Sequence, residues 1–345
     1  MNKYLLSCLI FSLFFINGFA QKPEKLSANE IHESIKELNF LGSVLYLAAH
    51  PDDENTRLIS YFSNEVHART AYLSITRGDG GQNLISPGIR ELLGVIRTNE
   101  LLKARETDGG EQFFTRANDF GYSKHPDETL SLWNKEEVLN DVVKVIRKFQ
   151  PDVIINRFNA ESAGKTHGHH TSSAVLSGEA FDLAGNKGMF KEQLKYVDVW
   201  QPRREFFNTS WWFYGSRENF DKADKTKLLE INTGTYYSAI GLSNNEVSSL
   251  SRSMHKSQGF GSTGSRGNTS EYLELVKGDL PNDKTNLFDG INTTWSRVKG
   301  GEEIGELLLI IENEYDYTNP TASIEKLLNV YQLIKTIENN HWKKL

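Results

Sequence analysis

Short apolar runs alternate along this chain with longer segments whose apolar residues recur at helical spacing. The runs Val44–Ala49, Ala71–Ile75 and Val153–Ile155 are typical of buried strands. Apolar residues recur every three or four positions from Pro87 to about Glu106, and again in a segment that opens at Asn134. Strands that alternate with amphipathic helices predict an α/β fold: a mainly parallel sheet with helices on both faces, in three layers.

Helix-start signals refine this picture. Ser243 and Asn134 are each followed three positions later by a glutamate, which is the spacing of a capping box. The helix that opens at Ser243 is expected to run to about Gln258. A short helix is also expected at Glu30–Leu38, before the first strand.

The second half of the chain is less regular. The aromatic segment Trp200–Tyr214 is expected to lie over the sheet edge or to line a cleft, and Gly259–Asn268 to form a Gly/Ser-rich loop. Leu307–Ile311 is predicted as a strand, and Ile324–Ile334 as a closing amphipathic helix. Neither repeats nor a linker mark a boundary, so we predict a single large domain.

The first twenty residues have the pattern of a secretory signal peptide, with a short basic start, an apolar run and small residues before Gln21. We therefore expect a secreted or periplasmic protein of a bacterium, without a transmembrane segment after cleavage. A lipid anchor at Cys8 is less favoured, because the apolar run continues past it. No other segment approaches the roughly 20 continuous apolar residues of a membrane span.

Composition excludes several kinds of chemistry. Cys8 is the only cysteine, so the mature chain would have no disulfide, thiolate metal site or cysteine nucleophile. The formal net charge is −6, with basic and acidic residues interspersed, and no basic stripe indicates nucleic-acid binding. The 19 Phe, 13 Tyr and 6 Trp suit a core, and they also suit surfaces that stack on sugars.

Metal-ligating side chains follow two of the predicted strands. His50, Asp52 and Asp53 come directly after the first strand, and His167-Gly168-His169-His170 follows the strand at Val153. Carboxyl ends of parallel strands meet at one edge of a sheet, where ligands bind. Two histidines and one carboxylate with an open position form a known catalytic zinc arrangement. The sequence therefore predicts a metal site at this edge.

Ala49-His50-Pro51-Asp52-Asp53-Glu54 with a later His-x-x-His resembles the PIG-L/LmbE-like family, the N-acetylglucosaminyl-phosphatidylinositol de-N-acetylase superfamily. Thr76–Gly81, Arg97–Leu101 and His255–Gln258 resemble further motifs of that family in the same order. The resemblance implies a Rossmann-like fold, a divalent metal, and hydrolysis of N-acetyl groups from glucosamine-containing substrates. The motifs cover about residues 40–260, so we expect one PIG-L-like domain at 21–345 with its core at about 40–260, after the signal peptide at 1–20, and the apolar patterns described above add a C-terminal strand and helix extension.

Carried over by motif, the metal ligands are His50, Asp53 and His170, with zinc as the first choice and Fe²⁺ or Co²⁺ as alternatives. Asp52 matches the general base that takes a proton from the metal-activated water. His167 matches the residue that assists the oxyanion or the leaving amine, in a protonated form if it stabilises the oxyanion. Because His169 adjoins His170, a register with His169 as the ligand stays open.

Four further charged residues are candidates for contacts to sugar hydroxyls: Asp79, Arg97, Asp119 and His255. Each also has an ordinary structural interpretation. Arg97 could pair with Glu91 or Glu100 on a helix surface, Asp119 could form an Asx turn, and His255 could cap its own helix. Glu54 could support a metal ligand or simply begin the next helix.

These features predict an exported, metal-dependent N-deacetylase that acts on a small molecule or glycan containing N-acetylglucosamine. A sugar O-acetyl esterase or a non-catalytic carbohydrate-binding protein are the alternatives. Gly259–Gly264 matches the dinucleotide pattern Gly-x-Gly-x-x-Gly, but no strand precedes it and no helical pattern follows. An NAD-dependent oxidoreductase is therefore disfavoured, and the segment is interpreted as a flexible loop or lid.

Overall fold

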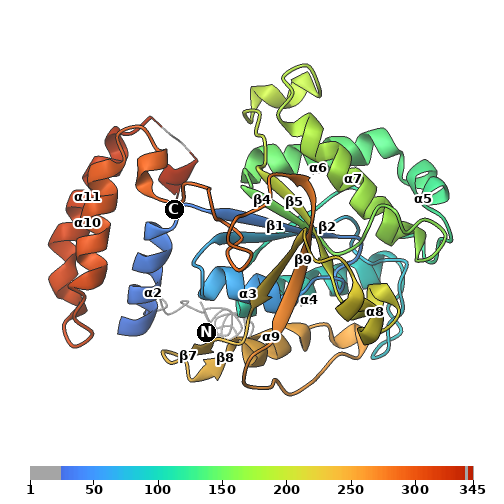
Figure 1. The fold of residues 1–345 in the computed structure, drawn as a ribbon, viewed down its shortest axis with the longest axis horizontal. Coiled ribbons are helices and arrows are strands. Elements are labelled where there is room, and N and C mark those ends of the chain that lie inside the picture. The colour runs from blue at the N-terminus through green and yellow to red at the C-terminus, as the bar shows by residue number, and fades with distance from the viewer. Residues whose placement is uncertain (1–24, 339–340, 345) are drawn as a thin grey trace, which may run out of the picture.

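The structure, a computed structural model, describes residues 25–338 and 341–344 (Figure 1). A seven-stranded sheet lies at its centre, in the order β3-β2-β1-β4-β5-β9-β6. The strands of this sheet are β1 (Ser43–Ala48), β2 (Arg69–Ser74), β3 (Glu111–Phe114), β4 (Val153–Asn156), β5 (Arg204–Thr209), β6 (Leu228–Asn232) and β9 (Ser270–Gly278). A separate two-stranded sheet is formed by β7 (Tyr236–Tyr237) and β8 (Leu242–Ser243).

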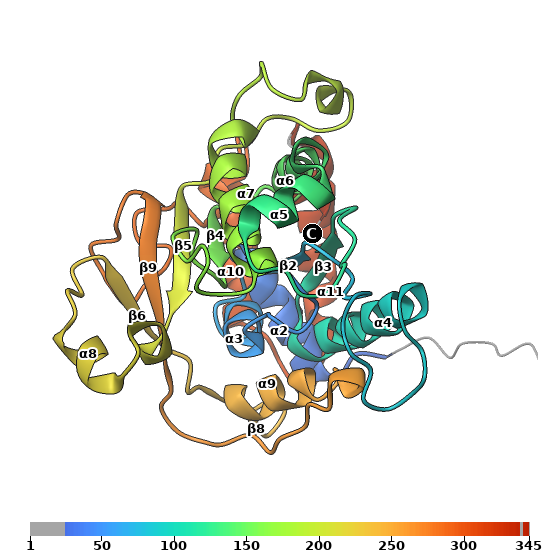
Figure 2. The same cartoon turned by 90° about the vertical axis from the view of Figure 1, so that its right-hand side faces the viewer.

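The helices flank this sheet and connect its strands. They are α2 (Ala28–Asn39), α3 (Thr56–Asn64), α4 (Glu91–Asp108), α5 (Pro126–Trp133), α6 (Lys135–Phe149), α7 (Gly168–Ala184), α8 (Arg217–Lys222), α9 (Asn244–Arg252), α10 (Glu302–Asn313) and α11 (Ile324–Thr336). Figure 2 shows α6 and α7 on one side of the sheet, with α3, α4 and α9 on the other.

The first five strands are parallel to one another, whereas β9 runs antiparallel to both β5 and β6. From β1, the chain first builds outward through β2 to β3 and then returns to place β4 on the other side of β1. The strand order therefore reverses between β1 and β4. In open parallel sheets, a crevice forms at the carboxyl ends of the strands at such a point.

Successive side chains of the strands point to opposite faces of the sheet and form two separate hydrophobic cores. Leu45 and Leu47 face the helices α6 and α7, and Val44 and Tyr46 face α3. A strand buried on both faces reads as a continuous apolar run, which is why β1 is recognisable in the sequence. The predicted α/β fold, a single domain with a mainly parallel sheet between two helical layers, is confirmed.

A third core lies at the amino-terminal end of the strands, where α2, α10 and α11 pack together (left in Figure 1). Trp295 is buried there and donates its indole N–H to the carbonyl of Leu38 at 2.7 Å. The strand predicted at Leu307–Ile311 is wrong, because these residues belong to α10. Because all five residues are apolar, the sequence does not show which of them face the core. In the helix, Leu308 and Ile311 are buried three positions apart, whereas Leu309 is half exposed.

Other expectations about single elements have mixed outcomes. The helix at Glu30–Leu38 is confirmed as part of α2, and Ser243 forms a complete capping box on α9. That helix ends at Arg252 rather than Gln258. The capping box expected at Asn134 is wrong: Asn134 also ends α5, in a left-handed conformation with φ 56°, and its side chain bonds no helix N–H.

The segment Trp200–Tyr214 contains a strand of the main sheet, β5, followed by a 3-10 turn at Trp211–Tyr214. Its expected position over the sheet edge is therefore wrong for the strand, whereas Trp212 and Phe213 in the turn do line a cavity.

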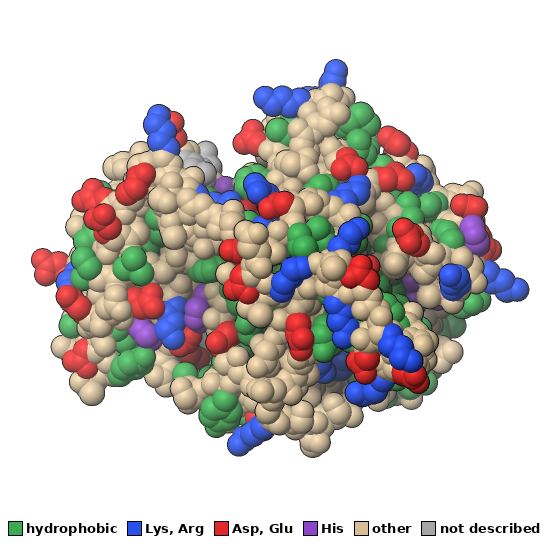
Figure 3. Space-filling model, viewed as in Figure 1, with side chains coloured by type: hydrophobic (Ala, Val, Ile, Leu, Met, Phe, Trp, Pro, Cys, Tyr) green, Lys and Arg blue, Asp and Glu red, His purple; other side chains and the backbone are tan. Residues whose placement is uncertain are grey.

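On the face seen in Figure 3, basic and acidic side chains are interspersed. No helix in the described part of the chain is long and apolar enough to cross a membrane. The predicted signal peptide at residues 1–20 lies outside the described residues.

Candidate active site

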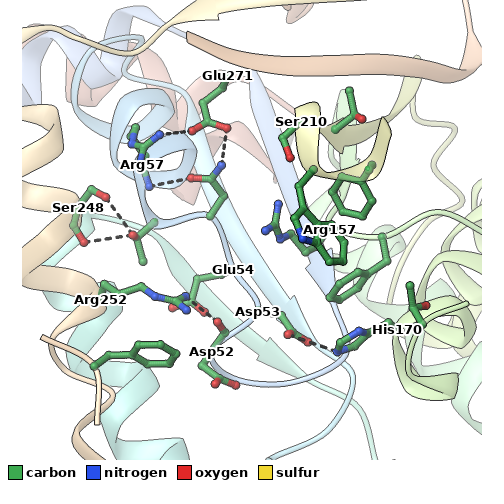
Figure 4. Close-up of a pocket in the computed structure, with 18 of the residues that line it drawn as sticks. Asp52, Asp53, Glu54, Arg57, Arg157, His170, Ser210, Ser248, Arg252 and Glu271 are labelled. Carbon is green, nitrogen blue, oxygen red and sulfur yellow. Dashed lines mark hydrogen bonds and ion pairs between the residues drawn. The ribbon is translucent and has the colours of Figure 1, made fainter. Parts of the chain in front are cut away.

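His50, Asp53 and His170 come together where β1 and β4 end side by side. The Nδ1 atom of His50 lies 3.0 Å from Oδ2 of Asp53, and Nε2 of His170 lies 3.6 Å from Oδ1 of Asp53. Figure 4 shows Asp53 and His170 pointing toward each other. All three offer a donor atom within 4.8 Å of the others, in the combination that the motifs predict.

The turn after β1 holds these side chains in place. The backbone N–H of His50 donates to Oδ2 of Asp53 at 2.8 Å, and the N–H of Asp53 donates to the carbonyl of His50 at 3.2 Å. Tyr72 on β2 donates its hydroxyl to the same carbonyl. The His170 ring stacks on Phe158 with centroids 3.8 Å apart. These contacts fix the backbone of the turn and the orientation of the His170 ring.

The electrostatics of the trio suit a cation. Burial alone would raise the pKa of Asp53, but the positive charges of His170 and His50 and hydrogen bonds from His50 hold that pKa well below its usual range. An ionised carboxylate and two imidazole nitrogens that converge on one point form a donor set that fits zinc and related divalent metals.

His169 lies on the other side of the His50 ring. Its Nδ1 is 3.0 Å from Nε2 of His50, and its ring is fully buried. His50, His167 and His169 form a second group whose nitrogens converge, but this group contains no carboxylate. A histidine that binds a metal through one ring nitrogen usually donates a hydrogen bond from the other, and His169 is placed to accept it. His170 therefore shares a group of converging donors with Asp53, whereas His169 is placed to orient the His50 ring.

Asp52 lines the same cavity as Asp53 and His170, and Arg97 donates to its Oδ1. Arg97 also donates to the carbonyl of Gly78 at 3.2 Å, and it is 97% buried, with 3% of its surface exposed. Arg97 therefore holds Asp52 and does not stand free for a sugar hydroxyl. The alternative pairing on the helix surface with Glu91 or Glu100 is wrong.

His167 is the N-cap of α7, and its Nδ1 accepts the backbone N–H of His169 at 3.1 Å. It also lines the cavity. Burial and the positive charges of His50 and His170 lower the pKa of His167 to about 4. This favours a neutral ring, in contrast to the protonated form considered from the sequence.

Of the expected substrate contacts, Asp119 lies beside His50, and Asp79 contacts Asp119 in turn. Asp119 accepts the N–H of Gly121 at 2.9 Å, which is the expected Asx turn, and its Oδ2 is 3.9 Å from Nε2 of His50. Asp79 accepts the N–H of Asp119 at 3.4 Å, and burial raises its pKa. Neither carboxylate lines the large cavity.

His255 is fully buried, and its Nε2 lies 2.6 Å from Oε1 of Glu54. Arg105 on α4 lies beside the same carboxylate at 3.4 Å and pairs with Asp108 at 2.6 Å. His255 therefore neither caps its helix nor faces substrate. Glu54 joins the turn after β1 to α4 and to the segment that follows α9. The next helix, α3, begins at Thr56 with Asn55 as its cap.

A cavity of about 850 Å³ opens from the trio and extends beneath the turn after β5. The motifs indicated one end of this cavity at Asp52, Asp53, His167 and His170, and the segments Trp200–Tyr214 and Gly259–Asn268 contribute two further parts of its lining. Sequence reasoning missed the rest, which comes from separate parts of the chain and follows no motif. The residues missed include Asn55, Arg57, Arg157, Lys165, Arg252 and Glu271.

Solved structures similar to this chain include N,N'-diacetylchitobiose deacetylase from Pyrococcus horikoshii, at 18% identity and a TM-score of 0.40. The match covers 48% of this chain and 59% of that one. A 4-carboxy-2-hydroxymuconate hydratase from Pseudomonas putida is 14% identical with a TM-score of 0.45, over 70% of this chain and 99% of the other. A deacetylase of teicoplanin biosynthesis is 13% identical with a TM-score of 0.37, over 69% and 100%.

The family model of PIG-L, described as GlcNAc-PI de-N-acetylase, matches residues 45–181. The matched segment starts within β1 and ends within α7, so it contains the trio, Asp52 and His167. Over this part of the chain, the resemblance to the PIG-L family inferred from the motifs is confirmed.

Proposed function

We propose that this protein is a metal-dependent hydrolase that removes the N-acetyl group from a glycan or glycoconjugate containing N-acetylglucosamine. One observation carries the proposal: His50, Asp53 and His170 converge at the end of a cavity that Asp52 also lines. All four residues lie in the segment that matches a family of de-N-acetylases.

The metal would be held by His50, Asp53 and His170. A divalent cation bound there would supply Lewis acidity to the acetyl carbonyl and to the attacking water. Zinc suits two imidazoles and one carboxylate, and Fe²⁺ and Co²⁺ accept the same donors.

Asp52 is the proposed general base. Arg97 occupies its Oδ1, which leaves Oδ2 to take a proton from the water as the water attacks the carbonyl carbon. When the C–N bond breaks, the same carboxyl group returns the proton to the leaving amine. Acetate and a free amino sugar are the products. The side chain is 20% exposed, so water can reach it.

His167 is the proposed donor to the oxyanion. Because its Nδ1 accepts the N–H of His169, the proton of a neutral ring lies on Nε2. Nε2–H can then donate to the developing negative charge without the ring being protonated. The helix cap thus selects the tautomer that the reaction needs.

Export to the periplasm or beyond is part of this proposal and is supported by the pattern of residues 1–20 alone. Fractionation of the native host, with N-terminal sequencing of the extracytoplasmic protein, tests it. A start at Gln21 would support cleavage after Ala20, and an intact leader in the cytoplasm would contradict export.

The central test measures acetate release from N-acetylglucosamine oligosaccharides and conjugates, together with the metal content of the protein. Asp52→Asn is expected to lower kcat by about 10²- to 10⁴-fold, the usual contribution of a general base, while the metal stays bound. Asp127→Asn is a matched control, because Asp127 is 89% exposed and outside the cavity.

Full activity of Asp52→Asn with bound metal would contradict the mechanism. If O-acetylated hexosamines released acetate much faster than N-acetylated ones, a sugar esterase would replace the N-deacetylase.

A further inference from the structure

The helix α4 presents apolar side chains to solvent on the side that points away from the rest of the molecule. Its inward side, with Leu93 and Leu101, is buried. Its outward side carries Leu92, Val95 and Leu102, which are all exposed. Figure 2 shows α4 at the outer edge of the molecule. A surface helix usually turns polar residues to the solvent, so the outward side of α4 needs a separate explanation.

The turn before α4 extends the apolar surface of the helix. Asn83 donates its side-chain amide to the carbonyl of Gly88 at 2.8 Å, and Leu84 donates its backbone N–H to the carbonyl of Ser257 at 2.8 Å. Gly88 lies against the side chain of Leu92. The backbone of the turn is therefore fixed on the start of the helix. The turn exposes the side chains of Leu84, Ile85 and Ile89.

Turn and helix together form what we call the apolar face of α4. Its six residues, all 42–64% exposed, are Leu84, Ile85, Ile89, Leu92, Val95 and Leu102. At such fractions each side chain exposes roughly 100 Å², so the face presents on the order of 600 Å², the upper end of what a monomer usually leaves open to water. Two such faces in contact would bury on the order of 1,200 Å², which is enough for a specific interface.

The chemistry of this face favours an identical copy as its partner. All six residues are aliphatic, and interfaces between identical subunits are more apolar than transient interfaces between different proteins. Charges of both signs flank the face, with Arg90 and Glu91 at the start of α4 and Lys103 and Glu106 near its end. Two antiparallel copies would bring the start of one helix to the end of the other, where opposite charges are available on both sides.

We propose that two copies of this chain associate through the apolar face of α4, with the two helices antiparallel about a two-fold axis near Asn99. Asn99 is exposed between Val95 and Leu102, so an axis there places the apolar side chains of one copy against those of the other. None of the six residues of the face lines the cavity beside the metal trio. The dimer is therefore independent of the proposed hydrolysis.

The first test measures the mass of the full chain in solution by analytical ultracentrifugation. We expect the wild type to be a dimer at the upper end of a range from about 1 to 100 µM. Leu92→Glu and Val95→Glu, made singly, should each raise the dissociation constant at least about 10-fold, because each would bury a charge without a partner in the interface.

The matched control is Leu328→Glu. Leu328 is 56% exposed on α11, at the other end of the sheet, so the same substitution there should leave the dimer unchanged. Thermal unfolding of all three variants checks that they are folded, since substitutions at such exposed positions have little effect on stability.

A disulfide tests the antiparallel arrangement. In a Cys8→Ser background, which removes the only native cysteine, Asn99→Cys introduces a single thiol near the proposed axis. There it would face its own counterpart, and oxidation is expected to give a covalent dimer. Asn329→Cys, at an exposed position of α11, is the control and is expected to stay uncrosslinked under the same conditions.

A wild type that sediments as a monomer at about 100 µM would overturn the proposal. A dimer that neither Leu92→Glu nor Val95→Glu weakens would also overturn it. If the monomer instead floated with phosphatidylcholine vesicles and Leu92→Glu abolished flotation, a lipid bilayer would replace the second copy as the occupant of the face. Equal crosslinking of Asn99→Cys and Asn329→Cys would contradict the antiparallel arrangement.

Discussion

Two adjacent aspartates differ in the groups that hold them. Asp53 lies between two imidazoles, whereas Asp52 is held by a buried guanidinium. In the proposed mechanism this difference gives each carboxylate one task, since of the two only Asp53 belongs to the group of converging donors, and Arg97 holds only Oδ1 of Asp52. Two neighbouring residues of one motif thus differ because their side chains have different partners in the fold.

Arg97→Lys tests whether that guanidinium positions Asp52. A lysine ammonium cannot reproduce the two directed hydrogen bonds to Asp52 and to the Gly78 carbonyl. We expect kcat to fall by about 10- to 100-fold, with KM and metal content close to the wild-type values, because a misplaced base slows only the chemical step. Steady-state kinetics with metal analysis check this. A raised KM with unchanged kcat would instead indicate that Arg97 contacts the substrate.

The roles of His169 and His170 can be distinguished by measuring how well each alanine variant retains the metal. His170→Ala is expected to lose the metal, because it removes one of three donors. His169→Ala should keep the metal with an affinity weakened by about 10- to 100-fold, the usual effect of removing a group that orients a ligand. Mass spectrometry of metal content after dialysis against a graded chelator measures both. The opposite order would assign the ligand to His169.

The sequence predicted those site residues whose positions follow from local patterns, and it did not predict those whose positions depend on distant contacts. His50, Asp53 and His170 could be placed together because their strands are short apolar runs that end at one edge of a parallel sheet. Arg97 and His255 could not be assigned correctly, since their partners lie 45 and 201 positions away and nothing local indicates the contact. Both were expected at the substrate, and both are buried supports.

At the scale of elements, the start of α9 is stabilised by the predicted capping box of Ser243 and Glu246 and by a distant arginine. Ser243 accepts the N–H of Glu246, and Glu246 accepts the N–H of Ser243 at 2.7 Å. Arg266 donates to the same carboxylate at 3.0 Å. Hydrogen bonds from Arg266 and then from the Ser243 backbone lower the pKa of Glu246 to about 2.

That lowered pKa gives a pH dependence with a defined sign. The carboxylate is favoured in the folded state, so its stabilisation is complete above the ordinary pKa of 4.5 and is lost as the pH falls toward 2. We expect Glu246→Gln to be less stable than the wild type at pH 7, with the difference shrinking below about pH 4.5. Urea unfolding of both proteins at several pH values checks this; a difference that grows toward acid would contradict it.

Elements were predictable where burial left a simple pattern and unpredictable where it did not. The strand β5 is buried at all six positions although it contains Arg204 and Glu205, so it could not be predicted from an apolar run. Arg204 is satisfied by carbonyls, including those of Leu287 and Asp289, which a sequence cannot foresee. In α10 the error was the reverse: five consecutive apolar residues led to the prediction of a strand where the chain forms a helix.

At the scale of the whole molecule, the helical layer of α2, α10 and α11 lies at the end of the sheet opposite the site. Leu308→Ala should destabilise the fold by about 2 to 5 kcal/mol, because Leu308 is fully buried. We expect kcat/KM to stay unchanged at temperatures where the variant is folded. Chemical denaturation and kinetics measure the two effects separately.

The neighbouring residue provides the control. Leu309 is 52% exposed on the same helix, so Leu309→Ala should change stability by less than about 0.5 kcal/mol. If Leu308→Ala lowered activity in proportion to its loss of stability under native conditions, the helical layer and the site would be coupled.

The division of the cavity wall along the chain has a consequence for evolution and engineering. The end of the cavity with the proposed metal site is encoded within residues 45–181, the segment that the family model matches, whereas Trp212 and Glu271 of the opposite wall follow it. Arg252 and His255 also follow it, but they contact the turn after β1 and would have to be kept. Substitutions at positions such as Trp212 are therefore a more direct route to new substrate ranges of the proposed hydrolase than exchange of the whole region after residue 181.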